Sequence, residues 1–233
     1  MLEEIKQKIT NDSEYLEWMA KISEIETEFA NSSPSNNQVA LDHGKNHMDR
    51  VANTTYTLLK EYGMDERTSF LGYVSGLVHD IGMIYGKKNH AENGSELASS
   101  FLKRLNFLTE KEIEEIKSAI STHGSGANAT SIIGSFLAVA DKVDMCERRT
   151  LGISSPIQLI KKYDVAIQNK TLKIFYELSS KDGKSGLYMI PKSIDVPTFI
   201  ANSLGLQVEF YIDGKLEKFE DRNSYQGYVY KRK

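Results

Sequence analysis

The chain has 233 residues, with 29 basic and 32 acidic side chains and a formal net charge of −3. Hydrophobic residues make up 40% and charged residues 26% of it, which excludes a disordered chain, and the near-neutral charge argues against a general nucleic-acid binder. The single cysteine, Cys146, excludes an internal disulfide and any zinc cluster built on cysteines. The N-terminus lacks an apolar signal segment, and the longest apolar run, residues 131–140, is too short to span a bilayer. A soluble cytoplasmic protein is expected.

Residues 1–30 are expected to form one amphipathic helix that packs on the main body. Apolar side chains recur there at spacings of three and four: Tyr15, Leu16, Met19, Ile22, Ile25 and Phe29. The acidic face of this helix is interpreted as solvated surface. A polar, turn-forming stretch over residues 31–38 then connects the helix to the central region.

Every long periodic segment between Asp42 and Glu147 has helical spacing. Five helices are expected: one from an N-cap at Asp42, then helices over about 65–83, about 91–105, 109–123 and about 131–147. The fourth has a capping-box pattern, Thr109-x-x-Glu112, and Gly124 stops it. Together they predict one helical domain over residues 31–153.

The period changes to two after Pro156 and a short helical piece. Residues 172–178 and 206–212 alternate apolar and polar side chains and are predicted strands. Asp213-Gly214 is a strong hairpin signal, and residues 195–204, closed by Gly205, have the pattern of a helix. The predicted fold class is therefore mainly α, a helical bundle followed by a small α+β module over residues 154–233 whose role the sequence does not indicate.

All five histidines lie in the helical region: His43, His47, His79, His90 and His123. Several of them, and Asp141, fall on predicted apolar faces. Burying an imidazole or a carboxylate without a partner costs several kcal/mol, so these groups are expected to share a cation. The ordered candidate set is His47, His79, Asp80, His90, His123 and Asp141. Four imidazoles and two carboxylates exceed the usual demand of one ion, which favours two metals.

The pattern His47…His79-Asp80…Asp141 resembles the HD-domain superfamily of metal-dependent phosphohydrolases. The resemblance covers about residues 42–147 and includes the segments around Arg50-Val51, Gly82 and Ala140. It implies an HD-domain helical bundle in which one metal is held by His47, His79, Asp80 and Asp141. It also implies that Asp80 bridges to a second metal held by His90 and His123, and that a metal-bound water attacks phosphorus. In a site with one metal, His90 and His123 would instead contact the metal ligands or the substrate phosphate.

Further roles follow from the resemblance or from position in the sequence. The expected catalytic residues are Asp80, His43, which would protonate the leaving oxygen, and Arg50, as a phosphate clamp or a structural ion-pair partner. Lys87 and Lys88 are expected to contact substrate phosphate, in place of the lysine that many relatives have at the position of Met83; the alternative is a solvated loop pair. Asp144 is expected either to accept a hydrogen bond from one of the metal ligands or to be a polar residue at a helix edge. Arg148 and Arg149 are expected at the surface.

The expected function is hydrolysis of a phosphate ester of a small molecule, most simply a nucleotide, with two divalent ions per chain. The sequence does not distinguish Fe, Mn, Mg, Ni, Co and Zn. A diiron oxygenase of the same family and a non-enzymatic nucleotide sensor are the alternatives. No membrane partner is expected, a nucleic-acid partner is disfavoured, and a homodimer through the C-terminal module is one expected assembly.

Overall fold

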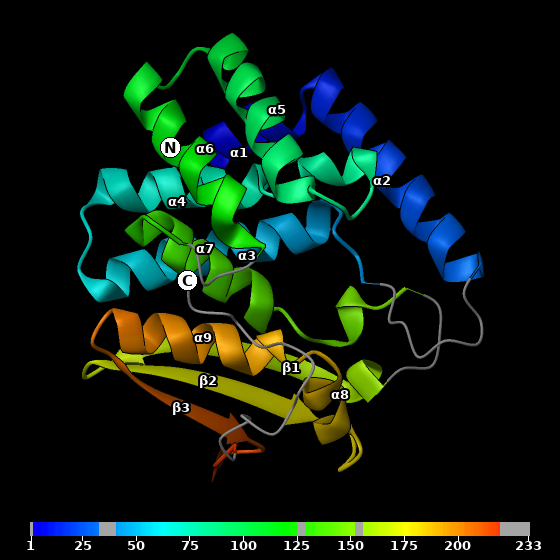
Figure 1. Ribbon diagram of the computed structural model, residues 1–233, viewed down its shortest axis with the longest axis vertical. Helices are drawn as coiled ribbons and strands as arrows, with labels where there is room; N and C mark the ends of the chain where they lie inside the picture. The colour runs from blue at the N-terminus through cyan, green and yellow to red at the C-terminus, as the bar shows by residue number, and fades with distance from the viewer. Residues whose placement is uncertain (1, 33–40, 125–128, 152–155, 220–233) are drawn as a thin grey trace.

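The computed structural model describes residues 2–32, 41–124, 129–151 and 156–219 and places a helical body over a small sheet (Figure 1). The helical body is formed by these elements: α1 (Leu2–Thr10), α2 (Ser13–Ser32), α3 (Lys45–Tyr62), α4 (Glu66–Val78), the 3-10 helix η1 (Ile81–Tyr85), α5 (His90–Leu105), α6 (Glu110–His123) and α7 (Ile132–Val143). The mainly helical class with a C-terminal α+β module is confirmed. None of the helices in these ranges is both long and apolar enough to cross a bilayer.

The N-terminal segment contains two helices, not the single one expected over residues 1–30. The break falls at Asp12, whose Oδ1 accepts a hydrogen bond from the backbone N–H of Glu14 and so starts α2. Arg104 of α5 donates to both carboxylate oxygens of Asp12 at 2.9 and 2.7 Å. Tyr15 is fully buried, and its hydroxyl donates to the carbonyl of Leu77. Helix α2 is therefore fastened to α4 and α5.

The ends of α3 and α4 differ in part from expectation. Helix α3 begins three residues after Asp42, because Asp42 accepts a bond from the N–H of Gly44 and Gly44 occupies the N-cap. Asp65 caps α4 through the N–H of Thr68. Helix α4 ends at Val78, however, and the chain continues as η1 instead of one helix to residue 83.

Helix α6 begins with the predicted capping box, in which Thr109 and Glu112 bond each other's backbone N–H groups. Helix α7 begins at the N-cap Ser131 but ends at Val143, four residues before the predicted end. The reason is Asp144, which leaves the helical conformation and directs its carboxylate toward α3. Helix α7 is therefore shorter than predicted, and Asp144 forms a buried polar contact with His47.

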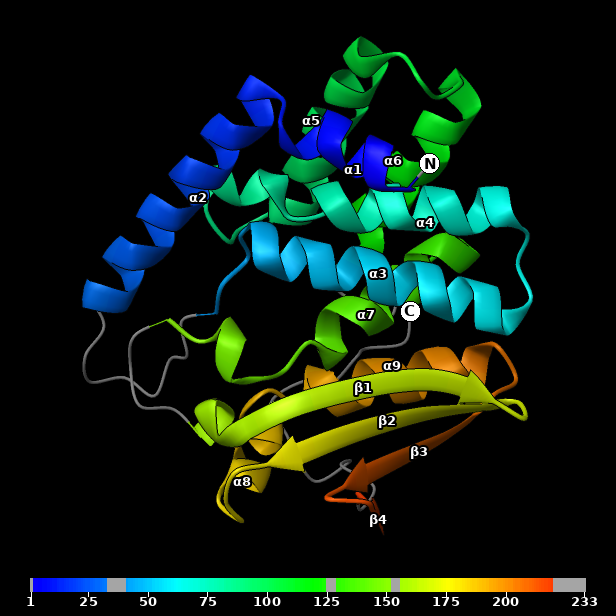
Figure 2. The same ribbon diagram turned by 180° about the vertical axis from the view of Figure 1, so that it is seen from behind.

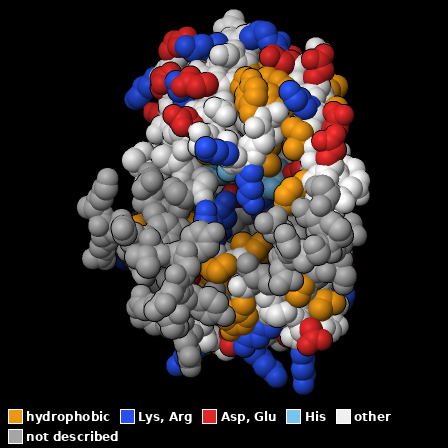
Figure 3. Space-filling view, turned by 45° about the vertical axis from the view of Figure 1, so that its right-hand side comes forward, with side chains coloured by type: hydrophobic (Ala, Val, Ile, Leu, Met, Phe, Trp, Pro, Cys, Tyr) orange, Lys and Arg blue, Asp and Glu red, His pale blue; other side chains and the backbone are white. Residues whose placement is uncertain are grey.

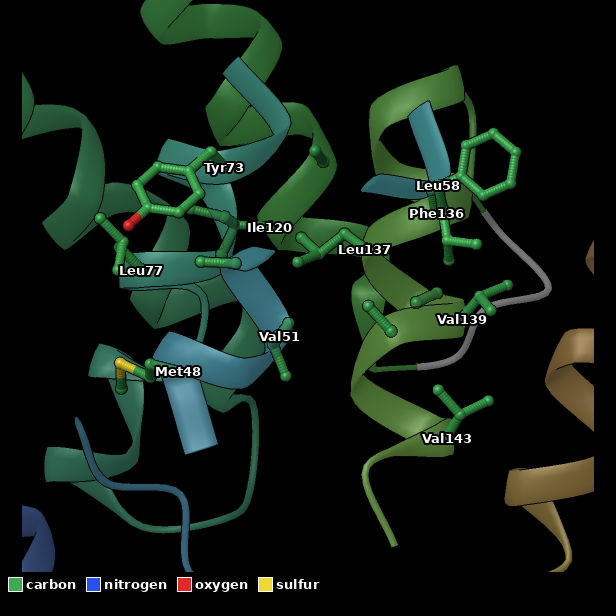
Figure 4. Close-up of a cluster of buried hydrophobic side chains, with 14 of the residues drawn as sticks. Met48, Val51, Leu58, Tyr73, Leu77, Ile120, Phe136, Leu137, Val139 and Val143 are labelled. Atoms are coloured by element: carbon green, nitrogen blue, oxygen red, sulfur yellow. The ribbon is translucent and has the colours of Figure 1, made fainter. Parts of the chain in front are cut away.

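The core lies between α3, α4, α6 and α7, and its side chains come from all four helices (Figure 4). Those labelled in Figure 4 are Met48, Val51, Leu58, Tyr73, Leu77, Ile120, Phe136, Leu137, Val139 and Val143. Helices α3 and α4 approach closely where Gly76 faces Ala52. A Cβ on Gly76 would lie 2.6 Å from the backbone nitrogen of Ala52, closer than real Cβ atoms come.

Gly76→Ala is therefore expected to destabilise the protein by about 1–3 kcal/mol, since α3 and α4 must separate. In an unhindered helix the same change would stabilise by a few tenths to about 1 kcal/mol, so the sign is diagnostic. Chemical unfolding of both proteins measures it. Adding Ala52→Gly should not restore stability, because the clash involves backbone atoms; a variant as stable as wild type would contradict the close packing.

After α7 the helical body ends with the short 3-10 helix η2 (Glu147–Arg149). The elements of the C-terminal module are η3 (Pro156–Leu159), β1 (Ile160–Gln168), β2 (Thr171–Leu178), α8 (Gly183–Met189), α9 (Lys192–Ser203), β3 (Gln207–Ile212) and β4 (Lys215–Glu217). The sheet order is β1-β2-β3-β4, with β2 and β3 parallel and the other neighbours antiparallel. The β3–β4 turn has positive φ at Asp213 and Gly214, as the hairpin signal predicts.

Strand β1 and helix α8 were not predicted, and α9 begins three residues earlier than expected. A register shift lies between Ile160 and Lys162 at the start of β1, and Tyr163, Val165 and Ile167 alternate along the rest of the strand. The module lies below α3 and α7 (Figure 2), and α9 packs on both α7 and β3. The hydroxyl of Tyr176 donates to the carbonyl of Val143 at 3.5 Å, and one buried apolar cluster runs from the helices into the sheet.

Candidate metal centre

Five elements bring the six expected ligands together. His47 lies on α3, and His79 and Asp80 directly follow α4. His90 is the first residue of α5, His123 is the last residue of α6, and Asp141 lies on α7. Their candidate ligand atoms form two groups, each within 4.8 Å: His47, His79, Asp80 and Asp141 in one, and Asp80, His90 and His123 in the other. Asp80 is common to both. We name them the first and the second ligand group.

The two oxygens of the Asp80 carboxylate face different ligand groups. Its Oδ2 lies 3.1 Å from Nε2 of His79 and 3.5 Å from that of His47. Its Oδ1 lies 3.3 Å from Nε2 of His123 and 3.5 Å from that of His90. One oxygen faces each group, which is the arrangement of a carboxylate that bridges two ions.

The second ligand group depends on a close approach between η1 and α5. A Cβ on Gly82 would lie 2.1 Å from the carbonyl oxygen of His90 and 2.4 Å from the nitrogen of Gly94. Only a residue without a side chain fits there. Gly82 therefore holds His90 close to Asp80, which explains why His-Asp is followed by Gly at this spacing.

Every ligand imidazole is fixed through Nδ1. Nδ1 of His79 lies 2.9 Å from the carbonyl of Gly76. Nδ1 of His123 lies 2.6 Å from the carbonyl of Ile120, and Nδ1 of His90 lies 2.9 Å from the carbonyl of Lys87. A carbonyl accepts only, so each Nδ1 carries the proton and each Nε2 is left with a lone pair. Nε2 of His79 and His123 and Oδ1 of Asp80 are buried without a hydrogen-bond partner among the described residues. These three orphaned atoms fit a bound cation.

The carboxylates of both groups are held ionised. Burial would raise the pKa of Asp80, but the imidazoles of His79, His123 and His47 around it outweigh burial and hold the pKa well below its usual range. Burial would also raise the pKa of Asp141. The neighbouring Lys142, His47 and Arg149 outweigh burial and hold this pKa well below its usual range. Both side chains therefore present negative oxygen to a cation at neutral pH.

Comparison with known proteins assigns the family of this region. Residues 44–146 match the family described as HD domain. The chain contains an HD domain. It is also 28% identical over 177 residues to Ribonuclease Y of Latilactobacillus sakei subsp. sakei (strain 23K), a match that covers 74% of this chain and 31% of the relative. The chain thus spans about a third of that relative's length.

The comparison with solved structures also found a predicted HD superfamily hydrolase from an uncultured Thermotogales bacterium. The two chains are 23% identical, with a TM-score of 0.40, and the match covers 56% of this chain and 67% of the other. The HD domain of the present chain holds the His and Asp side chains in groups compatible with divalent ions.

Asp144 and Arg50 lie behind the first ligand group of the HD domain. Oδ2 of the buried Asp144 is 2.5 Å from Nδ1 of His47, and Arg50 donates to both oxygens of Asp144 at 2.8 and 2.9 Å. Asp144 thus contacts the candidate ligand His47, and Arg50 forms an ion pair with Asp144, as one of the two interpretations of each residue expected. Arg50 orients His47 through Asp144.

Arg149 was wrongly expected at the surface; it is 4% exposed. Its Nη1 donates to the carbonyls of Asp141 and Asp144, and its Nη2 lies 3.1 Å from Oδ1 of Asp141 and 3.2 Å from Nε2 of His47. It belongs to a short 3-10 turn after α7 that returns the chain to the site. Its neighbour Arg148 is exposed, as expected. Two adjacent arginines after a helix gave no sequence signal for one being buried.

His43 lies beside the HD ligands and has a partner that the sequence analysis missed. Nδ1 of His43 is 2.5 Å from Oε1 of Glu26, which also accepts the backbone N–H of His43 at 3.0 Å. Glu26 lies on α2, outside the matched region, and is 6% exposed. It was assigned to a solvated acidic face, although its spacing of four from Ile22 and three from Phe29 places it on the apolar side. That spacing was the available signal.

Burial dominates the protonation of this pair. It raises the pKa of Glu26 to about 8 and lowers the pKa of His43 to about 3. Between pH 4.5 and 8 Glu26 binds more protons when folded, so its contribution to stability falls as pH rises. Between pH 3 and 6.5 His43 binds fewer protons when folded, so its contribution rises. The two effects oppose each other up to pH 6.5, and above it only the loss from Glu26 remains.

Glu26→Gln should remove that loss. Wild-type metal-free protein is expected to show a lower Tm at pH 8 than at pH 6.5, and the variant a smaller decrease, because Gln does not titrate. Thermal unfolding at both pH values compares the slopes, so any uniform destabilisation of the variant cancels. An equal decrease in both proteins would contradict the buried, neutral Glu26.

Lys87 and Lys88 lie on the exposed loop between η1 and α5. The carbonyl of Lys87 fixes the ring of His90, as described above. Tyr85, at the end of η1, is 60% exposed, and Lys21 of α2 lies over its ring. The loop thus offers cations and an aromatic face near the second ligand group.

Proposed function

We propose that this chain is a metal-dependent phosphohydrolase that cleaves a phosphate ester of a small molecule, most simply a nucleotide. The observation that carries the proposal is the division of Asp80 between two ligand groups, with one oxygen toward each. Two divalent ions, when bound, supply a water of lowered pKa and polarise the phosphoryl oxygen. The HD domain match supports the same reaction class.

The side chains of this chain would hold and orient the reacting groups. Asp80 and Asp141 supply negative oxygens, and the Nδ1 contacts of the histidines keep each Nε2 directed inward. Arg50 acts through Asp144 and not directly on phosphate. His43, held at Nδ1 by Glu26, has Nε2 available to protonate the leaving oxygen. The raised pKa of Glu26 keeps a proton on this pair near neutral pH.

The exposed loop supports a nucleotide substrate. Lys87 and Lys88 can approach phosphate oxygens, and the exposed ring of Tyr85 offers a stacking surface for a base. A phosphodiester of RNA is the second candidate, because the curated relative is named Ribonuclease Y. The near-neutral charge of the chain favours the small substrate.

Product analysis tests the proposal. The protein reconstituted separately with Mn²⁺, Mg²⁺, Fe²⁺, Co²⁺, Ni²⁺ and Zn²⁺ is incubated without oxygen with mononucleotides, nucleoside di- and triphosphates, p-nitrophenyl phosphate and a short oligoribonucleotide. We expect release of phosphate from at least one small ester. Cleavage of the oligoribonucleotide alone would favour the second candidate, and no cleavage with any metal would contradict both.

A further inference from the structure

Lys192 brings a positive charge from the C-terminal module to the proposed metal centre. It is the first residue of α9, and its Nζ donates to the carbonyl of Gly124 at 3.0 Å. Gly124 directly follows His123, and a Cβ placed on it would lie 3.7 Å from Cε1 and 3.9 Å from Nε2 of His90. Lys192 is therefore anchored beside two residues of the second ligand group.

Two further lysines surround the same place. Lys142 follows Asp141 on α7 and pairs with its carboxylate. Lys87 lies on the loop before His90. Both act on Lys192 electrostatically: burial and the charges of Lys142 and Lys87 together lower its pKa, although the charge of Asp141 acts in the opposite direction. Figure 3 shows histidine side chains in a hollow bordered by Lys and Arg side chains.

This arrangement is unfavourable without an anion. A cation at the first position of a helix opposes the helix dipole, and neighbouring ammonium groups repel each other. In the described part of the chain, Lys192 forms no ion pair with a carboxylate. Asp141 is already shared by Lys142 and Arg149. Bound divalent ions would add further positive charge, so an anionic group is needed here.

We propose that Lys192, Lys142 and Lys87 form an anion subsite beside the Asp80 centre that binds a second phosphoryl group of the substrate. The preferred substrate then carries at least two phosphates, as a nucleoside di- or triphosphate does. The subsite deepens the proposed function and rests on it. It also gives the C-terminal module a role, because α9 completes the binding site from outside the HD match.

Calorimetric titration of the Mn²⁺-loaded protein with inorganic pyrophosphate and with orthophosphate tests the subsite without requiring turnover. Wild type should bind pyrophosphate more tightly. Lys192→Met should weaken pyrophosphate binding about tenfold, the value of one charge-assisted hydrogen bond, and orthophosphate binding much less. Lys192→Arg keeps the charge and should restore most of the affinity.

Lys181→Met is the matched control, because Lys181 is an exposed lysine of the same module and the charge change is identical. It should leave both affinities within about twofold. Equal affinity of wild type for the two anions, or an unchanged pyrophosphate affinity in a folded Lys192→Met, would overturn the subsite. If pyrophosphate binding responds as expected while no ester is cleaved, the subsite stands and the phosphohydrolase proposal fails.

Discussion

Asp80→Asn is expected to lower bound metal from about two ions per chain to less than one and phosphate release by on the order of 10³-fold. Asp80 contributes an oxygen to each ligand group, so its loss weakens both at once. Elemental analysis and initial rates at saturating Mn²⁺ measure the two effects. The substitution preserves the size of the side chain, so the helices should persist.

Asp164→Asn serves as the control for this change. Asp164 is an exposed aspartate on β1, outside the HD match. It should retain the metal content and rate of wild type. An Asp80→Asn protein with full metal content and full turnover would contradict the bridging role and, with it, the assignment of the site.

Arg149→Met is expected to destabilise the metal-free protein by about 3–5 kcal/mol, because it breaks a buried ion pair with Asp141 and leaves two buried carbonyls without their donor. Arg149 is the buried cation that contacts the Asp141 carboxylate, His47 and the carbonyls of Asp141 and Asp144. Saturating Mn²⁺ should recover part of this loss, since a divalent ion supplies positive charge to the same Asp141. Chemical unfolding with and without Mn²⁺ gives both values.

The adjacent arginine provides the comparison. Arg148 is exposed, and Arg148→Met should change stability by less than about 0.5 kcal/mol. Equal effects at the two positions would show that the contacts of Arg149 contribute nothing. If Mn²⁺ does not reduce the loss of unfolding free energy in Arg149→Met, Arg149 does not act on the same carboxylate as the metal.

Much of the site could be predicted because its residues lie on periodic helices. An imidazole or carboxylate on an apolar helix face must be buried, so His47, His123 and Asp141 were placed correctly by spacing alone. The capping box at Thr109 was also predicted correctly, since caps are local, whereas the N-cap predicted at Asp42 was wrong because Gly44 occupies that position. Local pattern therefore predicted most of the helices and the burial of these three side chains.

The missed features depend on contacts between distant segments. Glu26 becomes a partner of His43 only when α2 folds over the helical body, and Arg149 is buried only because η2 turns back to Asp141. Lys192 reaches Gly124 across 68 residues of sequence. Helix α7 ends earlier than predicted because Asp144 contacts His47, which is 97 residues away in the sequence. Helical periodicity indicates that Glu26 is buried, but it does not indicate which distant residue any of these side chains contacts.

Two divalent ions held by six side chains are the basis of the proposed function. Elemental analysis of wild type and His123→Ala, after identical reconstitution and removal of excess Mn²⁺, counts these ions. We predict about two ions per wild-type chain and about one in the variant, because the first ligand group does not include His123. One ion in both proteins would reduce the centre to a single site, and no bound ion in wild type would contradict it.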